Sequence, residues 1–311
     1  MTETWVYAIP LRTRFRGITV REGMLIQGPR GWGEFCPFTE YDDAEARRWL
    51  ATAVEQATVG WPAPVRDRIP VNCIVPAVDP SQAFKIAVGS GCSTAKVKVA
   101  DHRQSLGEDV ARVEAVRDAL GPNGKIRVDA NAAWDVDTAV VHIRALDRAA
   151  NGLEYVEQPC KSTAELAAVR RRVNVRIAVD ESIRRAENPL EVVVSGAADI
   201  AIIKCTPLGG VRKALRVAEA TGLPCVVSSA LETSVGLSAQ LALAGALPQL
   251  DFACGLGTLS LLTGDVVETP LVPVDGFLPV PTQPPRPVFT AFEASPGRAA
   301  WWRDRYTRVS A

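Results

Sequence analysis

The fold of this chain is indicated by residues 125–159, which read KIRVDAN (125–131), DVDTAVVHIRALDRAA (135–150) and LEYVEQP (153–159). The first and third segments contain short β-branched and apolar runs, which are typical of buried strands. In the middle segment, apolar residues recur at positions i, i+3 and i+4, which predicts a helix with one buried face. A strand, a helix and a second strand in this order predict a parallel sheet.

The same unit recurs along the middle of the chain, with turn residues such as GPNG (121–124) between the elements. Eight strands alternating with helices predict a (β/α)8-type barrel. An open doubly wound sheet is the alternative, but it would usually carry a glycine-rich nucleotide loop after its first strand, and VNCIVPAVDPS (71–81) has none. The expected strands are 71–75, 95–99, 125–131, 153–159, 176–182, 199–205, 224–230 and 251–256.

Three parts of the chain differ in pattern. Residues 1–68 contain strand-like and helical segments, and we expect them to form an N-terminal α+β capping domain. Residues 69–256 form the expected barrel. Residues 257–311 contain a proline-rich stretch (267–287), and we expect this segment to pack back on the capping domain.

Composition limits the function. The 311 residues include 35 Lys and Arg and 35 Asp and Glu, so the formal net charge is zero, which argues against nucleic acid or an anionic membrane as the main partner. The N-terminus lacks the pattern of a signal peptide, and the longest mostly apolar stretch, 236–248, is too short to span a bilayer. We therefore expect a cytoplasmic protein that acts on a small molecule.

Cysteine and histidine content also narrows the chemistry. The seven cysteines are odd in number and scattered, and no CxxC occurs, so we expect buried free thiols in a reducing compartment. His102 and His142 are the two histidines of the chain, so we do not expect a histidine-rich metal site or a catalytic histidine dyad.

Charged residues at the carboxyl ends of the expected strands are the main functional signal. A parallel strand buried on both faces should be nearly all apolar, yet strands two to six all carry charges there. Alternate residues of a barrel strand point inward, so these side chains should meet at the carboxyl mouth, where barrel enzymes have their active sites. They are Lys96, Lys98, Asp129, Glu157, Asp180, Glu181 and Lys204.

Three neighbouring buried carboxylates, Asp129, Glu157 and Asp180, would repel one another, and a divalent cation relieves that repulsion. An all-oxygen ligand set favours Mg²⁺ or Mn²⁺ over Zn²⁺. A purely structural network of Asp, Glu and Lys is the alternative. Charges on five consecutive strands favour a functional site.

These motifs together resemble the enolase superfamily. The matching segments are TAKVK (94–98), DANAAW (129–134), EQP (157–159), DES (180–182) and IIKC (202–205), in register on consecutive expected strands. In having lysines on both the second and the sixth strand, the chain is similar to the muconate-lactonizing group of this superfamily. Within that group, the chain most resembles the o-succinylbenzoate synthases, through FRGIT (15–19), VSSALETSVG (227–236) and CGLGTLSLLTGDV (254–266).

The resemblance implies a modified barrel with a capping domain, and it implies roles for the charged residues. Asp129, Glu157 and Asp180 would bind Mg²⁺, with Mn²⁺ able to substitute. Lys98 would be the general base, and Lys204 would lie on the opposite face of a small carboxylate substrate.

Further positions would support the site. Lys96 and Asn131 would support the site, while Ser229 and Gly255 would help to line the substrate pocket. Arg127 faces inward by its position two residues before Asp129, so it would either orient the site or neutralise it.

The implied activity is that of a lyase of menaquinone biosynthesis, the syn-dehydration of 2-succinyl-6-hydroxy-2,4-cyclohexadiene-1-carboxylate to o-succinylbenzoate. One alternative is an N-succinylamino acid racemase, or a bifunctional enzyme, in which Lys98 and Lys204 act as two bases. A dipeptide epimerase is disfavoured because the strand-eight region lacks a D-x-D motif. A Schiff-base barrel and a non-catalytic barrel are weaker alternatives, and the oligomeric state is left open.

Overall fold

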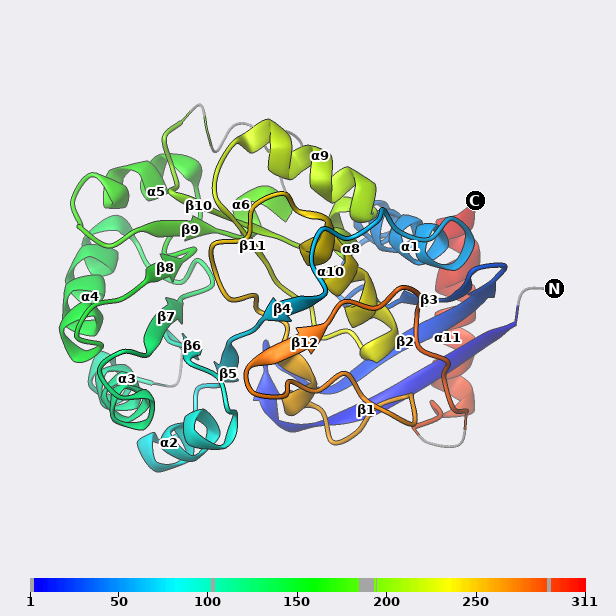
Figure 1. The fold of residues 1–311 in the computed structure, drawn as a ribbon, viewed down its shortest axis with the longest axis horizontal. Helices are drawn as coiled ribbons and strands as arrows, with labels where there is room; N and C mark the ends of the chain where they lie inside the picture. The colour runs from blue at the N-terminus through cyan, green and yellow to red at the C-terminus, as the bar shows by residue number, and fades with distance from the viewer. Residues whose placement is uncertain (1–2, 102–103, 185–192, 194, 290–291) are drawn as a thin grey trace.

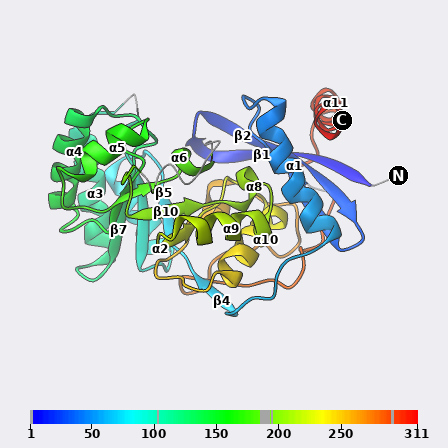
Figure 2. The ribbon, with the colours of Figure 1, turned by 90° about the horizontal axis from the view of Figure 1, so that it is seen from above.

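A computed structural model describes residues 3–101, 104–184, 193, 195–289 and 292–311 of the chain (Figure 1). An antiparallel sheet and two helices lie on one side of the molecule, and a curved parallel sheet surrounded by helices lies on the other. The two parts are also separate in the perpendicular view, where α1 and the first strands lie away from α3, α4 and α5 (Figure 2). Among the described residues, no helix combines the length and apolar character that crossing a membrane requires.

The capping domain is built on three antiparallel strands, β1 (Thr4–Phe15), β2 (Ile18–Gly28) and β3 (Gly31–Phe35), in that order. Helix α1 (Asp43–Thr58) packs on this sheet. The side chain of Asp42 accepts a hydrogen bond from the Glu45 amide at 2.7 Å, which caps the first turn of α1. The strand-like and helical segments expected in residues 1–68 are therefore present, as β1 to β3 and α1.

The parallel sheet has seven strands in sequence order. They are β5 (Cys73–Val75), β6 (Thr94–Lys98), β7 (Lys125–Asp129), β8 (Tyr155–Glu157), β9 (Ile177–Val179), β10 (Ile200–Ile203) and β11 (Cys225–Val227). The connecting helices are α2 (Pro80–Gly89), α3 (Leu106–Leu120), α4 (Val136–Ala149), α5 (Thr163–Arg170), α6 (Glu181–Arg184), α8 (Cys205–Leu208), α9 (Val211–Thr221) and α10 (Ser234–Ala246).

The expected eighth strand is reduced to two bridges that close the barrel. Gly255 bridges Ser228, directly after β11, and Cys254 bridges Val71, just before β5. A side chain at Gly255 would collide with Ser228, because an added Cβ would lie 2.6 Å from the Ser228 hydroxyl oxygen. The small residue thus permits the close approach of the last strand to β11, and the predicted (β/α)8-type architecture is confirmed in this modified form.

Apart from the buried Arg127, the inside of the barrel below the mouth is filled with apolar side chains. Tyr155, Ile200, Ile202, Val226 and Phe252 form a buried cluster with Ala178. Their positions alternate along the strands, as expected for inward-pointing residues. On these strands, the charged residues follow two positions later toward the carboxyl end, on the same face. The apolar layer therefore forms the floor of the site.

The C-terminal segment runs from the barrel back to the capping domain. After η1 (Thr258–Leu261), strand β12 (Phe277–Pro279) pairs with β4 (Arg68–Pro70). The last helix, α11 (Pro296–Ser310), packs against β1 and α1. Trp302 on α11 is fully buried and meets Phe35 edge to face, with ring centroids 5.8 Å apart. These contacts fit the expected packing of the C-terminal segment on the capping domain, while the boundaries after residues 68 and 256 stay a prediction.

Candidate active site

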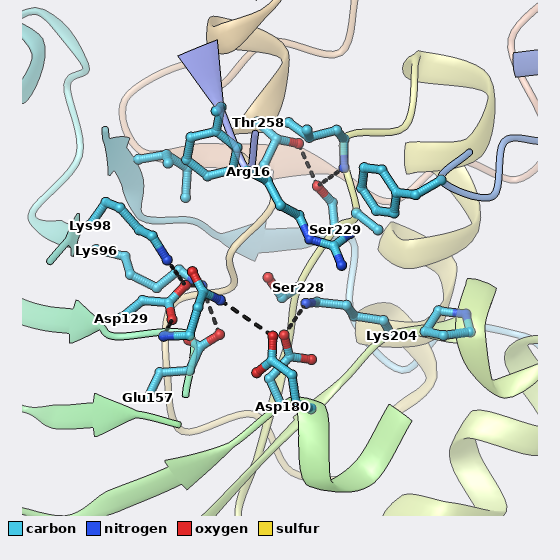
Figure 3. Close-up of a pocket in the computed structure, with 18 of the residues that line it drawn as sticks. Arg16, Lys96, Lys98, Asp129, Glu157, Asp180, Lys204, Ser228, Ser229 and Thr258 are labelled. Atoms are coloured by element: carbon cyan, nitrogen blue, oxygen red, sulfur yellow. Dashed lines mark hydrogen bonds and ion pairs between the residues drawn. The ribbon is translucent and has the colours of Figure 1, made fainter. Parts of the chain in front are cut away.

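Strand register brings the charged strand ends to one level of the barrel. Lys98 pairs with Asp129 between β6 and β7, and Asp129 pairs with Glu157 between β7 and β8. Glu157 pairs with Ala178, and Asp180 lies two residues beyond it on the same face. Figure 3 shows the three carboxylates pointing toward one another in the pocket.

Lys96 neutralises the centre of this cluster. Its Nζ donates to both oxygens of Glu157, at 2.9 and 3.1 Å, and lies 3.8 Å from Asp129 Oδ2. Burial alone would lower the pKa of Lys96, but the attraction of Glu157 and Asp129 outweighs burial and raises it. Lys96 is therefore held as a cation and is poorly suited to accept a proton.

The carboxylates differ in their electrostatic surroundings. Burial raises the pKa of Glu157 to about 7 despite the nearby Lys96. At Asp129 burial also raises the pKa, but Lys98 and Lys96 outweigh it and hold the pKa below its ordinary value. The backbone amide of Asn131 donates to Asp129 Oδ1 at 3.0 Å and favours its charged form.

Lys98 and Lys204 reach the pocket from opposite sides (Figure 3). Lys98 Nζ lies 4.0 Å from Asp129 Oδ2 and has no hydrogen-bond partner among the described residues. Lys204 Nζ donates to Asp180 Oδ2 at 2.6 Å, and the lysine is only 8% exposed. A planar substrate above the carboxylates would thus have one amine on each face.

The pocket above these groups encloses about 700 Å³, including its open mouth. Its wall combines residues of both domains. The barrel supplies the charged residues already described together with Ile74, Asn131, Glu181, Pro207, Ser228, Ser229, Ala230 and Leu231. The capping domain supplies Phe15, Arg16, Phe38, Tyr41 and Trp49, and the C-terminal segment supplies Thr258.

Arg16 is a pocket residue that sequence reasoning did not single out. It lies at the turn between β1 and β2, and its Nη2 donates to the Tyr41 hydroxyl at 2.7 Å. Its guanidinium carbon is 3.9 Å from the centre of the Phe38 ring. Arg16 belongs to FRGIT (15–19), a segment that carried part of the family resemblance. The alternation of side chains along strands cannot predict that this turn reaches the barrel mouth.

The remaining predicted residues surround the site at different depths. Ser229 lines the pocket, and its hydroxyl is 2.5 Å from that of Thr258. Gly255 lies behind this wall, where its carbonyl accepts from the Ser229 amide at 3.1 Å. The Asn131 side chain points into the same pocket and reaches Glu181 Oε1 at 3.4 Å.

Arg127 lies beneath the carboxylates and is fully buried. Its guanidinium donates to Glu154 Oε2 at 2.6 Å, to Asn72 Oδ1 at 3.0 Å and to the Ala253 carbonyl at 2.7 Å. These partners tie β7 to both sides of the barrel closure. We propose that Arg127 supports the site by holding this closure.

Comparison with known proteins identifies the family. Residues 6–57 match the model described as enolase N-terminal domain-like, and residues 81–284 match enolase C-terminal domain-like. An o-succinylbenzoate synthase of Thermobifida fusca (strain YX) is 66% identical over 274 residues, which cover 88% of this chain and 86% of the relative.

The chain belongs to the o-succinylbenzoate synthases of the enolase superfamily. An o-succinylbenzoate synthase of Mycobacterium tuberculosis (strain ATCC 25618 / H37Rv) is 52% identical, covering 97% of this chain and 91% of the relative. Among solved structures, the L-Ala-D/L-Glu epimerase of Bacillus subtilis superimposes with a TM-score of 0.78 at 24% identity, over 95% of this chain and 99% of the epimerase. That likeness shows the fold, which this synthase shares with the epimerase.

Enzymes of the enolase superfamily use a divalent metal, typically Mg²⁺. In the described part of this synthase, no three His, Cys, Asp or Glu side chains are arranged to hold a metal ion as they stand, and Lys96 and Lys204 bind two of the carboxylates. The atoms that these carboxylates offer nevertheless suit a magnesium ion. Asp129, Glu157 and Asp180 offer only oxygen ligands, all buried and on successive strands, which is the ligand type that Mg²⁺ prefers.

Proposed function

We propose that this synthase converts 2-succinyl-6-hydroxy-2,4-cyclohexadiene-1-carboxylate to o-succinylbenzoate by syn-dehydration, as a step of menaquinone biosynthesis. The relatives at 52–66% identity are o-succinylbenzoate synthases, and the chain covers most of their length. The observation that carries the proposal is the placement of Lys98 and Lys204 on opposite sides of one pocket above three carboxylates.

Asp129, Glu157 and Asp180 would hold Mg²⁺, and Mn²⁺ could replace it. A bound dication supplies positive charge that makes the proton next to the substrate carboxylate more acidic. The apolar floor formed by residues such as Ile202 and Val226 excludes water from below the site. Charge–charge attraction is stronger where water is excluded, which favours development of an anion there.

Lys98 is proposed as the group that moves the proton. Its amine lies in the pocket and makes no hydrogen bond among the described residues, so its lone pair, once neutral, can face the substrate. The same amine can return the proton to the departing hydroxyl group, because syn-elimination removes both groups from one face. Loss of water then leaves an aromatic ring, which makes the reaction strongly downhill.

Lys204 is proposed to stabilise the anion from the other face. Its amine is held at 2.6 Å by Asp180, so a carboxylate orients it toward the pocket. A fixed cation placed where negative charge develops lowers the barrier without moving a proton.

The capping side of the pocket is suited to the succinyl tail. The substrate has a second carboxylate at the end of this tail, and Arg16 offers a guanidinium at the capping side of the pocket. Ser229 and Thr258 add hydroxyl groups at the pocket wall. We propose that these groups receive the tail while Lys98 and Lys204 flank the ring.

All seven cysteines are free and buried, as expected for a protein of a reducing compartment. Burial raises the pKa of thiols such as Cys254, to about 12, which makes them poor nucleophiles. We therefore propose a cytoplasmic location and assign the cysteines no part in the chemistry.

N-succinylamino acid racemisation is the second candidate, favoured by one observation. Lysines on both faces of a substrate are the arrangement that two-base racemisation needs. Ultraviolet or mass-spectrometric detection of o-succinylbenzoate, formed from the cyclohexadiene substrate with Mg²⁺, tests the first function. Deuterium exchange at the α-carbon of both enantiomers of an N-succinylamino acid tests the second.

A further inference from the structure

Arg21 is a buried arginine that connects the capping sheet to the wall of the pocket. It lies on β2 and is 2% exposed. Its Nε donates to the carbonyl of Leu231 at 2.9 Å, and its Nη2 donates to that of Ala230 at 3.1 Å. The same guanidinium donates to the Cys36 carbonyl at 2.5 Å within the capping domain. One side chain therefore links two segments about 200 residues apart in sequence.

The segment that Arg21 holds is strained. Ala230 and Leu231 both line the pocket, directly after Ser229. Leu231 has φ of +65°, in the left-handed region that residues other than glycine seldom adopt. Such a conformation persists when its surroundings hold it in place. The hydrogen bond from Arg21 to the Leu231 carbonyl supplies one of these restraints.

A second wall of the pocket also contacts Arg21. Its guanidinium carbon lies 4.5 Å from the centre of the Phe38 ring, which lines the capping side of the pocket. The charge of the guanidinium is offset by the buried carboxylates of Glu34 and Glu232 nearby. Because Arg21 does not line the pocket, it acts on the substrate only through these neighbours.

We propose that Arg21 is a positioning residue through which the capping domain sets the shape of the substrate pocket and hence the affinity for substrate. This inference rests on the proposed function only for the identity of the substrate that the pocket binds. A wall contact is made equally to substrate and transition state, so its loss should raise KM and leave kcat largely unchanged. Proton transfer is assigned to Lys98, whereas the Arg21 guanidinium bonds to the backbone carbonyls of Leu231, Cys36 and Ala230.

Arg21→Met, which removes the charged fork but keeps an unbranched apolar stem, tests the proposal. We expect KM for the cyclohexadiene substrate to rise at least about tenfold, with kcat within about threefold of wild type. Calorimetric affinity for the product o-succinylbenzoate should fall by a similar factor. Arg21→Lys should recover part of this loss, since it restores one donor, and it serves as the second variant if Arg21→Met does not fold.

Arg66→Met is the matched control. Arg66 also binds backbone carbonyls across the chain, those of Ala244 and Leu247, but it lies away from the pocket. Its loss should leave KM unchanged. Unchanged KM and product affinity in Arg21→Met would overturn the proposal, and so would a fall confined to kcat or an equal rise of KM in Arg66→Met.

Amide hydrogen exchange in the unliganded protein gives a readout that does not depend on the ligand. Arg21→Met should speed exchange in a peptide spanning 228–236, and Arg66→Met should not. If the wild-type enzyme neither forms nor binds o-succinylbenzoate, the proposed function fails. The exchange of residues 228–236 still decides the role of Arg21, and unaltered exchange there would overturn it.

Discussion

Lys98 and Lys204 approach one pocket from opposite sides, and each has a different relation to the carboxylates. Lys98 Nζ is 4.0 Å from Asp129 Oδ2, whereas Lys204 Nζ is hydrogen-bonded to Asp180 Oδ2 at 2.6 Å. This asymmetry suits unequal roles. The more loosely held amine is proposed to move the proton, and the tightly held one is proposed to stabilise charge.

Lys98→Ala should lower kcat by about 10²- to 10⁴-fold, the range by which a positioned general base accelerates a reaction. Lys98→Arg should not restore the rate, because a guanidinium does not give up its proton near neutral pH. Steady-state assays of product formation measure both. Lys125→Ala is the control, since Lys125 is exposed at the opposite end of β7. Near-normal turnover in Lys98→Ala would show that the base is another group.

Lys204→Ala should lower kcat by about 10²- to 10³-fold through loss of electrostatic stabilisation. Lys204→Arg retains a cation, so it should keep more dehydration activity than Lys204→Ala. It should keep no racemisation, because that reaction would need a neutral base at this position. Equal dehydration rates in Lys204→Arg and Lys204→Ala would contradict a purely electrostatic role.

Removal of divalent metal with EDTA should abolish activity, and Mg²⁺ or Mn²⁺ should restore it. The circular dichroism spectrum should stay unchanged, because the core of the barrel is apolar and does not depend on the site. In Asp129→Asn, calorimetry should find Mg²⁺ affinity reduced at least about tenfold. Full activity of metal-stripped enzyme would refute the metal assignment.

His142 should make stability depend on pH. Burial lowers its pKa from the ordinary 6.5, and its ring meets Trp134 edge to face at 5.1 Å. The unfolded chain therefore binds a proton near pH 6.5, whereas the folded chain binds it only at lower pH. This contribution to stability is present above pH 6.5 and is lost as the pH falls below it.

Urea unfolding at pH 7.5 and pH 5.5 tests this prediction. His142→Gln should lose less stability between the two pH values than wild type loses. His102 lies outside the described residues, so His102→Gln is measured in parallel to separate the two histidines. An identical pH dependence in wild type and His142→Gln would contradict the prediction.

Sequence alone predicted the parts of the site that depend on strand periodicity. Asp129, Glu157 and Asp180 close successive parallel strands, so topology and the two-residue alternation bring them to one mouth. The eighth strand was harder to define, because the bridges at Cys254 and Gly255 form only when the barrel closes.

The capping residues of the pocket could not be predicted in this way. Arg16 and Phe38 lie in a turn and a loop, and they reach the pocket only because the capping sheet docks on the barrel. Long-range contacts such as that of Arg21 with Leu231 join the capping sheet to the barrel, and the sequence carries no periodic signal for them.

The central claim is that this site dehydrates a succinylated cyclohexadiene carboxylate. The most direct measurement compares kcat/KM for dehydration with kcat/KM for N-succinylamino acid racemisation, on one Mg²⁺-loaded preparation. We predict that dehydration exceeds racemisation by at least about tenfold, roughly 1.4 kcal/mol of differential transition-state stabilisation. Absence of o-succinylbenzoate, or racemisation as fast as dehydration, would contradict the account.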